Sequence, residues 1–125
     1  MFLNFLLTSI VNGVTATGEL NTRRAADGRH PPFITSFELP AEHAAWPEGT
    51  LMAAGESYGS ARAAASTDTD IIGVLETRIG ENEQSGNVIL HGSVPADILK
   101  CEDDGEMVNA TQEQIIALRG IGIFV

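Results

Sequence analysis

Apolar and polar positions alternate most clearly just after a pair of prolines. Every second residue from Phe33 to Leu39 is apolar or threonine, whereas Ser36 and Glu38 occupy the opposite parity. A period of two predicts a strand with one buried face. Prolines at positions 31, 32 and 40 flank this stretch, and we expect them to bound it because proline donates no backbone hydrogen bond. The first strand of the folded body is therefore predicted here.

Continuous apolar runs predict three further strands. These runs are too short for a typical helix, and they lie at Thr50–Ala54, Ile71–Leu75 and Asn87–Gly92. Gly73, inside the second run, indicates a bend or a close approach of neighbouring backbone. The polar stretch from Gly80 to Gly86 predicts a hairpin loop between the last two strands.

Shorter segments predict turns. Pro47-Glu48-Gly49 is typical of a tight turn whose glycine adopts a positive φ. Ala41 to Ala45 predicts one helical turn, and Pro95 predicts another that carries the apolar pair Ile98-Leu99 inward. The segment 55–70, rich in small and polar residues, predicts loop and weak strand.

One capped helix is predicted near the end of the chain. Thr111 stands three residues before Gln114, the spacing at which each side chain of a capping box bonds the other residue's amide. Gly120 is expected to end the helix in the left-handed conformation. The predicted buried face of the helix consists of Ile115, Ile116 and Leu118. The predicted terminal strand, packed into the core or an interface, contains Ile121, Ile123 and Phe124.

Composition and charge narrow the class of protein. The chain has 125 residues, which fits one domain, and its 13 glycines and 5 prolines indicate many turns. We therefore predict a mainly β fold with one or two short helices. The net charge is −10: residues 31–125 carry −11, and residues 1–30 carry +1. Such a body repels nucleic acid, so no nucleic-acid partner is predicted.

The N-terminal quarter of the chain predicts an arm. Met1 to Val11 is apolar but lacks the basic residues that begin a signal peptide, and it is shorter than the roughly 20 residues that span a bilayer. Neither targeting nor a membrane partner is expected. The segment 12–30 has no sustained period. The predicted division is an extended arm at 1–32 and a β-rich body at 33–125, and the arm is either a tail without a partner or a segment that orders on another protein.

Candidate catalytic and metal sites are weak. His91, Asp97 and Cys101 could form a nucleophile with its base, but a cysteine close to Asp103 and Asp104 should have a raised thiol pKa. The acidic residues of segment 102–106 lack the spacing of a calcium loop, and the three histidines lack that of a zinc site. We predict no enzyme, metal or cofactor. A lone cysteine also forms no intrachain disulfide, which fits a reducing compartment.

The order of several motifs resembles a known family. The motifs are Ile72–Leu75, Asn87–Val94, Ala96–Leu99 and Gln112–Val125, preceded by Leu39-Pro40 and Glu48–Leu51. In this order they resemble the lambda-type head decoration proteins of tailed phages, over residues 39–125. The chain departs from that family in its apolar start and in the long acidic segment Cys101–Asn109, expected to be a solvated loop.

The resemblance implies a β-clip-like body that forms a homotrimer on the outer surface of the virion. Its partner would be the major capsid protein, and its role would be to cement the expanded head. The expected arm contacts to the capsid come from Phe2, Phe5, Leu6, Ile10, Val11, Arg23, Arg24 and Arg29. The expected trimer interface consists of Trp46, Ile121, Ile123, Phe124 and Val125.

Two rivals stay open. The first is a trimeric surface adhesion module that binds sugar or a host protein, which would require an exposed aromatic cluster; aromatic residues form only 6% of the chain. The second is a small hydrolase that uses Cys101.

Overall fold

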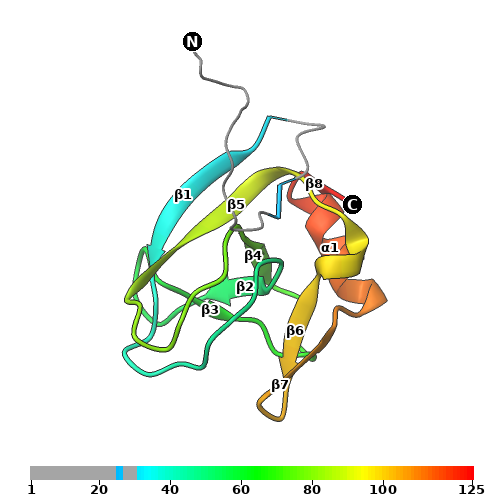
Figure 1. The fold of residues 1–125 in the computed structure, drawn as a ribbon. Coiled ribbons are helices and arrows are strands. Elements are labelled where there is room, and N and C mark those ends of the chain that lie inside the picture. Colours follow the sequence, from blue (N-terminus) through cyan, green and yellow to red (C-terminus); the bar gives the residue numbers. More distant parts are fainter. Residues whose placement is uncertain (1–24, 27–30) are drawn as a thin grey trace, which may run out of the picture.

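The computed structural model describes residues 25–26 and 31–125 (Figure 1). The strands are β1 (Phe33–Glu38), β2 (Leu51–Ala54), β3 (Ala61–Ala63), β4 (Ile71–Leu75), β5 (Ser85–Ser93), β6 (Lys100–Asp103), β7 (Glu106–Asn109) and β8 (Ile123–Phe124). A 3-10 turn, Ala96–Ile98, and one helix, α1 (Gln112–Gly120), complete the described elements. The prediction of a mainly β fold is confirmed. The predicted capsid contacts of the arm, at positions 2, 5, 6, 10, 11, 23, 24 and 29, lie outside the described residues.

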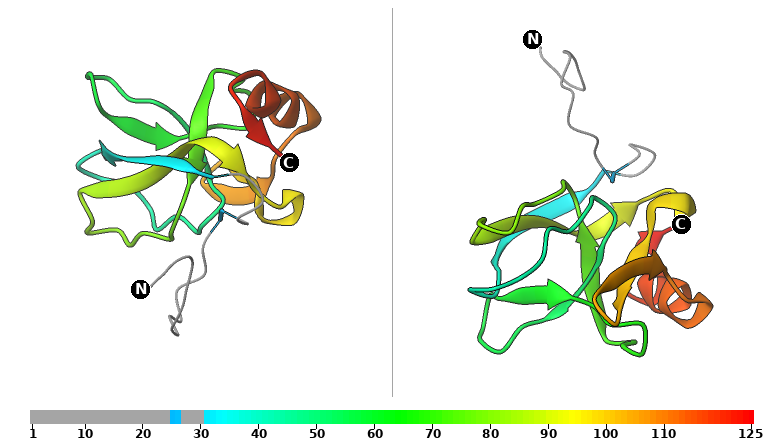
Figure 2. Two further views of the ribbon diagram at one scale, coloured as in Figure 1. Left: turned by 90° about the horizontal axis from the view of Figure 1, so that it is seen from above. Right: turned by 60° about the horizontal axis from the view of Figure 1, so that its bottom comes forward.

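A central antiparallel sheet organises the body. Its strand order is β1-β5-β4-β2-β3, and β8 adds a parallel pairing to the far end of β5. β6 and β7 form a separate hairpin, and α1 lies on the same side of the molecule as this hairpin (Figures 1 and 2). The strands predicted at 50–54, 71–75 and 87–92 are confirmed, and the run 71–75 becomes the middle strand of the sheet.

In the middle of the sheet both faces are buried, and neighbouring residues of a strand point into different clusters. One cluster contains Leu51, Val74 and Ile89 together with Leu118 of α1. The opposite cluster contains the neighbours of these strand residues in the sequence, Met52, Leu75 and Val88. They pack against Trp46, the chain's one tryptophan. A strand buried on both faces has no polar side to alternate with. This explains why the sequence here reads as continuous apolar runs.

Gly73 permits the closest packing of the sheet. A Cβ placed on Gly73 would overlap the carbonyl oxygen of Ile89 and would lie 2.6 Å from Cγ1 of Val88. Both neighbours belong to β5, which pairs with β4. The close backbone approach predicted from the glycine is therefore confirmed, and only a residue without a side chain fits this position.

Helix α1 confirms its predicted cap but not its predicted face. The side chain of Thr111 accepts from the amide of Gln114, and the side chain of Gln114 accepts from the amide of Thr111. Ile116, however, is 57% exposed, whereas Gln114 is fully buried. About 100° of rotation per residue places positions 114, 115 and 118 on one side and position 116 opposite. The prediction that Ile116 is buried was wrong because adjacent isoleucines cannot share this narrow face.

The chain leaves α1 later than the glycine pattern predicted. Ile121 still donates its amide to the carbonyl of Leu118, and the positive φ belongs to Gly122, at 95°, and not to Gly120. A Cβ on Gly122 would overlap the ring of His91. The turn into β8 therefore needs glycine two residues beyond the predicted position.

Two loop predictions were also wrong. The acidic segment Cys101–Asn109 is mostly the β6–β7 hairpin, whose two turn residues Asp104 and Gly105 have φ of 54° and 82°. Asp-Gly is a standard pair for such a turn. The helical turn predicted at Ala41–Ala45 is absent: the segment is a bend followed by irregular backbone, and it leads into Trp46, which exchanges two backbone hydrogen bonds with Ile79.

The two glycines at 73 and 120 offer a matched test of the packing. Gly73→Ala should reduce the free energy of unfolding by about 3 kcal/mol, because the added methyl overlaps backbone that cannot move away. Gly120→Ala meets nothing within 4 Å and should be neutral or stabilising by up to about 1 kcal/mol. Urea unfolding followed by Trp46 fluorescence measures both. Equal stability of the two variants would contradict the close approach.

Candidate functional site

The first feature of interest is the base of the arm, residues 25–26, where the chain enters the folded body. Ala25 is fully buried in the core, and its amide donates to the carbonyl of Glu76 at 3.0 Å. The next amide, of Ala26, donates to Oε1 of Glu76 at 3.2 Å. Glu76 is itself 1% exposed and donates its amide to Asn87 of β5. Residues 25–26, which sequence reasoning assigned to the arm, are therefore attached to the centre of the sheet.

The second surface is a groove along β1, here called the β1 groove. It has a volume of about 420 Å³ and is lined by Phe33, Thr35, Ser36, Phe37, Tyr58, Gly59 and Leu90. Phe33 is 62% exposed, and Tyr58 is fully exposed. The groove therefore combines two open aromatic rings with three hydroxyl groups. No charged side chain lines it, although the body as a whole is strongly acidic.

The third surface surrounds the end of the chain. Ile116, Ile121 and Phe124 are large apolar residues that are exposed. A groove of about 480 Å³ beside α1 is lined by Ile115, Ile116, Arg119 and Val125 among others. The ring of Phe124 meets that of His91 edge-on, with centroids 6.3 Å apart. This surface includes three of the residues predicted for the trimer interface.

The other two predicted interface residues lie inside the protein. Trp46 is 4% exposed and packs in one core cluster, and Ile123 is fully buried in the other. The indole nitrogen of Trp46 donates to Oε2 of Glu102 at 3.3 Å, so its polar atom is also satisfied within the chain. Neither side chain offers area to a second copy. The apolar surface at this end is built from exposed positions that alternate with core positions along β8.

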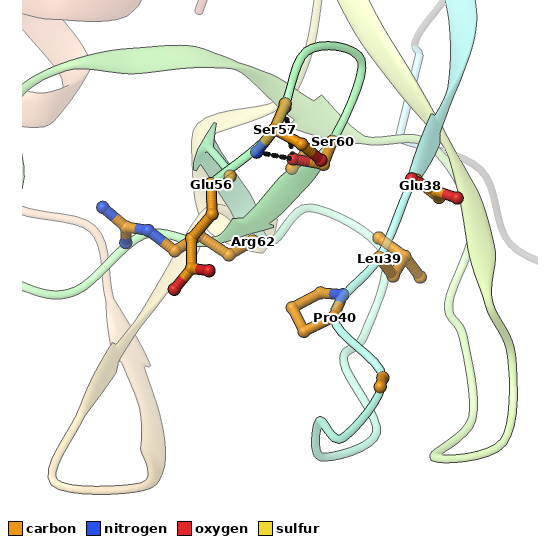
Figure 3. Close-up of a pocket in the computed structure, with 10 residues that line it drawn as sticks. Glu38, Leu39, Pro40, Glu56, Ser57, Ser60 and Arg62 are labelled. Carbon is orange, nitrogen blue, oxygen red and sulfur yellow. Dashed lines mark hydrogen bonds between the residues drawn. The ribbon is translucent and has the colours of Figure 1, made fainter.

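A hollow of about 310 Å³ lies between the end of β1 and the segment 55–62 (Figure 3). Its serines are used by the loop: Ser60 Oγ donates to the carbonyl of Ser57 and accepts from the amide of Ser57. Glu56 and Arg62 lie on one side of this hollow and Glu38 on the other (Figure 3). The hydroxyls therefore stabilise a turn, and the arrangement does not resemble a nucleophile held by a base.

Cys101, the candidate nucleophile, has a structural environment. Cys101 is fully buried, and its thiol donates to the carbonyl of Asn109 at 3.7 Å. Burial, and secondly the charge of Asp103, raises the thiol pKa, as predicted from the sequence. Such a thiol is a poor nucleophile. Within the described ranges, no three His, Cys, Asp or Glu residues come together as metal ligands.

One ion pair stabilises the loop that leads to β4. Nη1 of Arg62 lies 2.8 Å from Oδ2 of Asp68, which also accepts the amide of Ala65 at 2.9 Å. These bonds hold the pKa of Asp68 below its ordinary value of 3.8. The same loop is tied to α1, because the side-chain amide of Gln114 donates to the carbonyls of Ala65 and Asp68.

Sequence reasoning missed the β1 groove and the base of the arm. Tyr58 was the only large side chain in a predicted loop, and a fully exposed ring there was the available signal of an interaction surface. The alternation assigned Phe33 to a buried face, but β1 is an edge strand and this face lines the open groove. Nothing in the sequence around Ala25 indicates burial.

No helix in the described part of the chain is long and apolar enough to cross a membrane.

Asp68→Asn should lower stability at neutral pH by about 1 kcal/mol, because it removes a charge-assisted bond. The folded pKa is depressed, so this contribution is present above pH 3.8 and is lost as the pH falls through the folded pKa. The difference between wild type and variant in urea unfolding should therefore shrink on acidification. Asp70→Asn removes an equal charge nearby and should have no such effect. A pH-independent difference for Asp68→Asn would contradict the assignment.

Comparison with known proteins adds no relative. No family model matches the chain, and no curated protein matches it either. Its function therefore has to be argued from its own residues and their geometry.

Proposed function

We propose that the protein is a capsid decoration protein that binds the outside of an expanded phage head as a trimer and stabilises it. The observation that carries the proposal is the location of the motifs that resemble the decoration family. Four of them form β4, β5, the 3-10 turn, α1 and β8, while Leu39-Pro40 follows β1 and Glu48–Leu51 leads into β2. Each of these elements contributes residues to one core cluster, and β8 pairs with the end of β5 next to α1. Motifs scattered over the sequence thus belong to one structural unit.

The distribution of charge supports different roles for the body and the arm: the body faces solvent, and the arm contacts the capsid. Residues 31–125 carry a net charge of −11, whereas residues 1–30 carry +1 through three arginines against two acids. A strongly acidic body stays soluble and repels DNA. The less acidic arm is then the part suited to contact the major capsid protein, and no nucleic acid or membrane is needed as a partner.

The position of the arm's base supports attachment. Ala25 is held by Glu76, which follows the middle strand β4 and bonds Asn87 of β5, so a bound arm would be fixed to the interior of the sheet. In a trimer three such arms act together, and each additional arm binds at high effective concentration once the first has bound. Binding only the expanded shell would stabilise that shell by mass action.

The capsid role is tested by sedimentation with shells assembled from the cognate major capsid protein. The full chain should pellet with expanded but not with unexpanded shells. A chain lacking residues 1–24, which keeps Ala25 and its contacts, should stay in the supernatant, with Trp46 fluorescence as the check on folding. A triple variant, Arg23→Glu, Arg24→Glu and Arg29→Glu, should lose at least about tenfold in affinity. Full binding by the shortened chain would overturn the role of the arm.

The trimer is tested at the chain's end. Light scattering at micromolar concentration should give the mass of a trimer for the full chain. Ile121→Ser with Phe124→Ser should give a monomer, because the apolar area that drives association is lost. Tyr58→Ser removes an exposed ring from the β1 groove and should leave the trimer intact. A full chain that is monomeric would contradict the trimer. Loss of the trimer in Tyr58→Ser would place the interface at the β1 groove and not at the chain's end.

The adhesion module is retained as a second candidate because of the β1 groove. Phe33 and Tyr58 form the exposed aromatic pair that such a module requires, and aromatic faces stack on sugar rings. Thr35 and Ser36 supply hydroxyls in the same groove. Oligosaccharide binding that is abolished by Tyr58→Ser, together with failure to pellet with expanded shells, would favour this function over decoration.

A further inference from the structure

The outer edge of β1 is the longest sheet edge that the described residues leave open. β1 is the last strand in the order and has six residues, whereas β3 at the other edge has three. Only its end is covered, where Glu38 donates its amide to the carbonyl of Gly59. An open edge presents backbone groups with which another strand can pair.

Two hydrogen bonds fix which backbone groups of β1 point outward. Glu38 donates to Gly59, on the side away from β5. Asn87, which lies opposite Ser36, directs its carbonyl to Glu76 on the far side of β5. Residues along an antiparallel strand alternate in the direction of their amide and carbonyl groups. Ile34 and Ser36 therefore point their backbone groups away from β5, and no described residue pairs with them there.

The β1 groove reaches this open edge, because Tyr58 and Gly59, beside the outer side of β1, line it together with Leu90 of β5. Its chemistry differs from that of the other hollows. The hollow at segment 55–62 has Glu38, Glu56 and Arg62 in its wall, and the groove beside α1 has Arg119. The β1 groove has no charged residue in its wall. It thus suits an extended, uncharged peptide with apolar side chains, which can use both the backbone edge and the aromatic rings.

The chain itself contains such a segment. Residues 1–18 carry no charged side chain, and most residues from Phe2 to Val11 are large and apolar. We propose that Phe2–Val11 docks along the β1 groove of its own chain as an added strand, pairing with the outward backbone groups of Ile34 and Ser36. Left in water, this segment would expose a run of apolar side chains, and docking removes that run from solvent.

The chain between Val11 and Ala25 is long enough for Phe2–Val11 to reach the β1 groove of its own body, and this tether favours the same chain over a second copy. The residues between Val11 and Ala25 span up to about 46 Å when extended. Ala25 is bonded at β4, and two strand spacings, about 10 Å, separate β4 from β1. A tether of this length gives an effective concentration in the millimolar range, above the micromolar concentrations at which a second copy competes. This inference does not depend on the capsid role. A docked Phe2–Val11 segment is not free to bind a capsid, so capsid contact by these residues would first require their release from the groove.

Amide hydrogen exchange of the full chain, measured by NMR, tests the proposal within one strand. In wild type the outward amides of Ile34 and Ser36 should be protected. In a Phe5→Asp, Leu6→Asp variant they should exchange at least about tenfold faster, because the added charges oppose docking in an uncharged groove. The amides of Thr35 and Phe37 point toward β5 and should not change, so they control for unfolding.

Unprotected amides of Ile34 and Ser36 in wild type would overturn the proposal, and so would protection that the variant leaves unchanged. Protection that rises with protein concentration would assign the groove to a second copy and would equally overturn it. A second measurement tests the contact between the groove and the N-terminal segment directly. Tyr58→p-benzoylphenylalanine, a photo-cross-linker, should cross-link in the full chain to the tryptic peptide that ends at Arg23. The same probe at Ile116, on the surface beside α1, should not. None of these outcomes depends on binding to capsids.

Discussion

The body depends on the close approach of β4 and β5 at Gly73. Because the two strands meet there without a side chain between them, residues on both sides of the sheet are brought into register. Val74 and Ile89 then face one cluster, while Leu75 and Val88 face the other. Helix α1 covers the first cluster and Trp46 covers the second. Loss of this single approach would disturb both halves of the core together.

Large parts of this architecture could be read from the sequence, for identifiable reasons. The central strands were found because burial on both faces leaves unbroken apolar runs, and the start of α1 was found because Thr111 and Gln114 have the spacing of a capping box. These signals are local, within a few residues of each other. The order of the strands in the sheet was not predicted, because it depends on contacts between distant segments.

The failures have physical reasons of the same kind. The helical turn at 41–45 was predicted from local propensity, but Trp46 pairs with Ile79, which is distant in the sequence. The β6–β7 hairpin was overlooked because its acidic composition was weighed more heavily than its Asp-Gly turn. For the interaction surfaces, hydrophobicity alone did not separate Ile123, which faces the core, from Phe124, which faces solvent. Alternation along β8 decides between them, and two residues are too few to reveal it.

The anchoring of Ala25 has a mechanical consequence. A pull on the chain N-terminal to Ala25 passes first through the hydrogen bond to the carbonyl of Glu76, whose own amide is bonded to Asn87 of β5. The force therefore enters the sheet at the inner strands β4 and β5 and not at the edge strand β1, which follows Ala25 in the chain. Edge strands peel away one bond at a time, whereas central strands share the load among many bonds. The attachment thus allows the body to be held by its N-terminal segment without being unravelled from its edge.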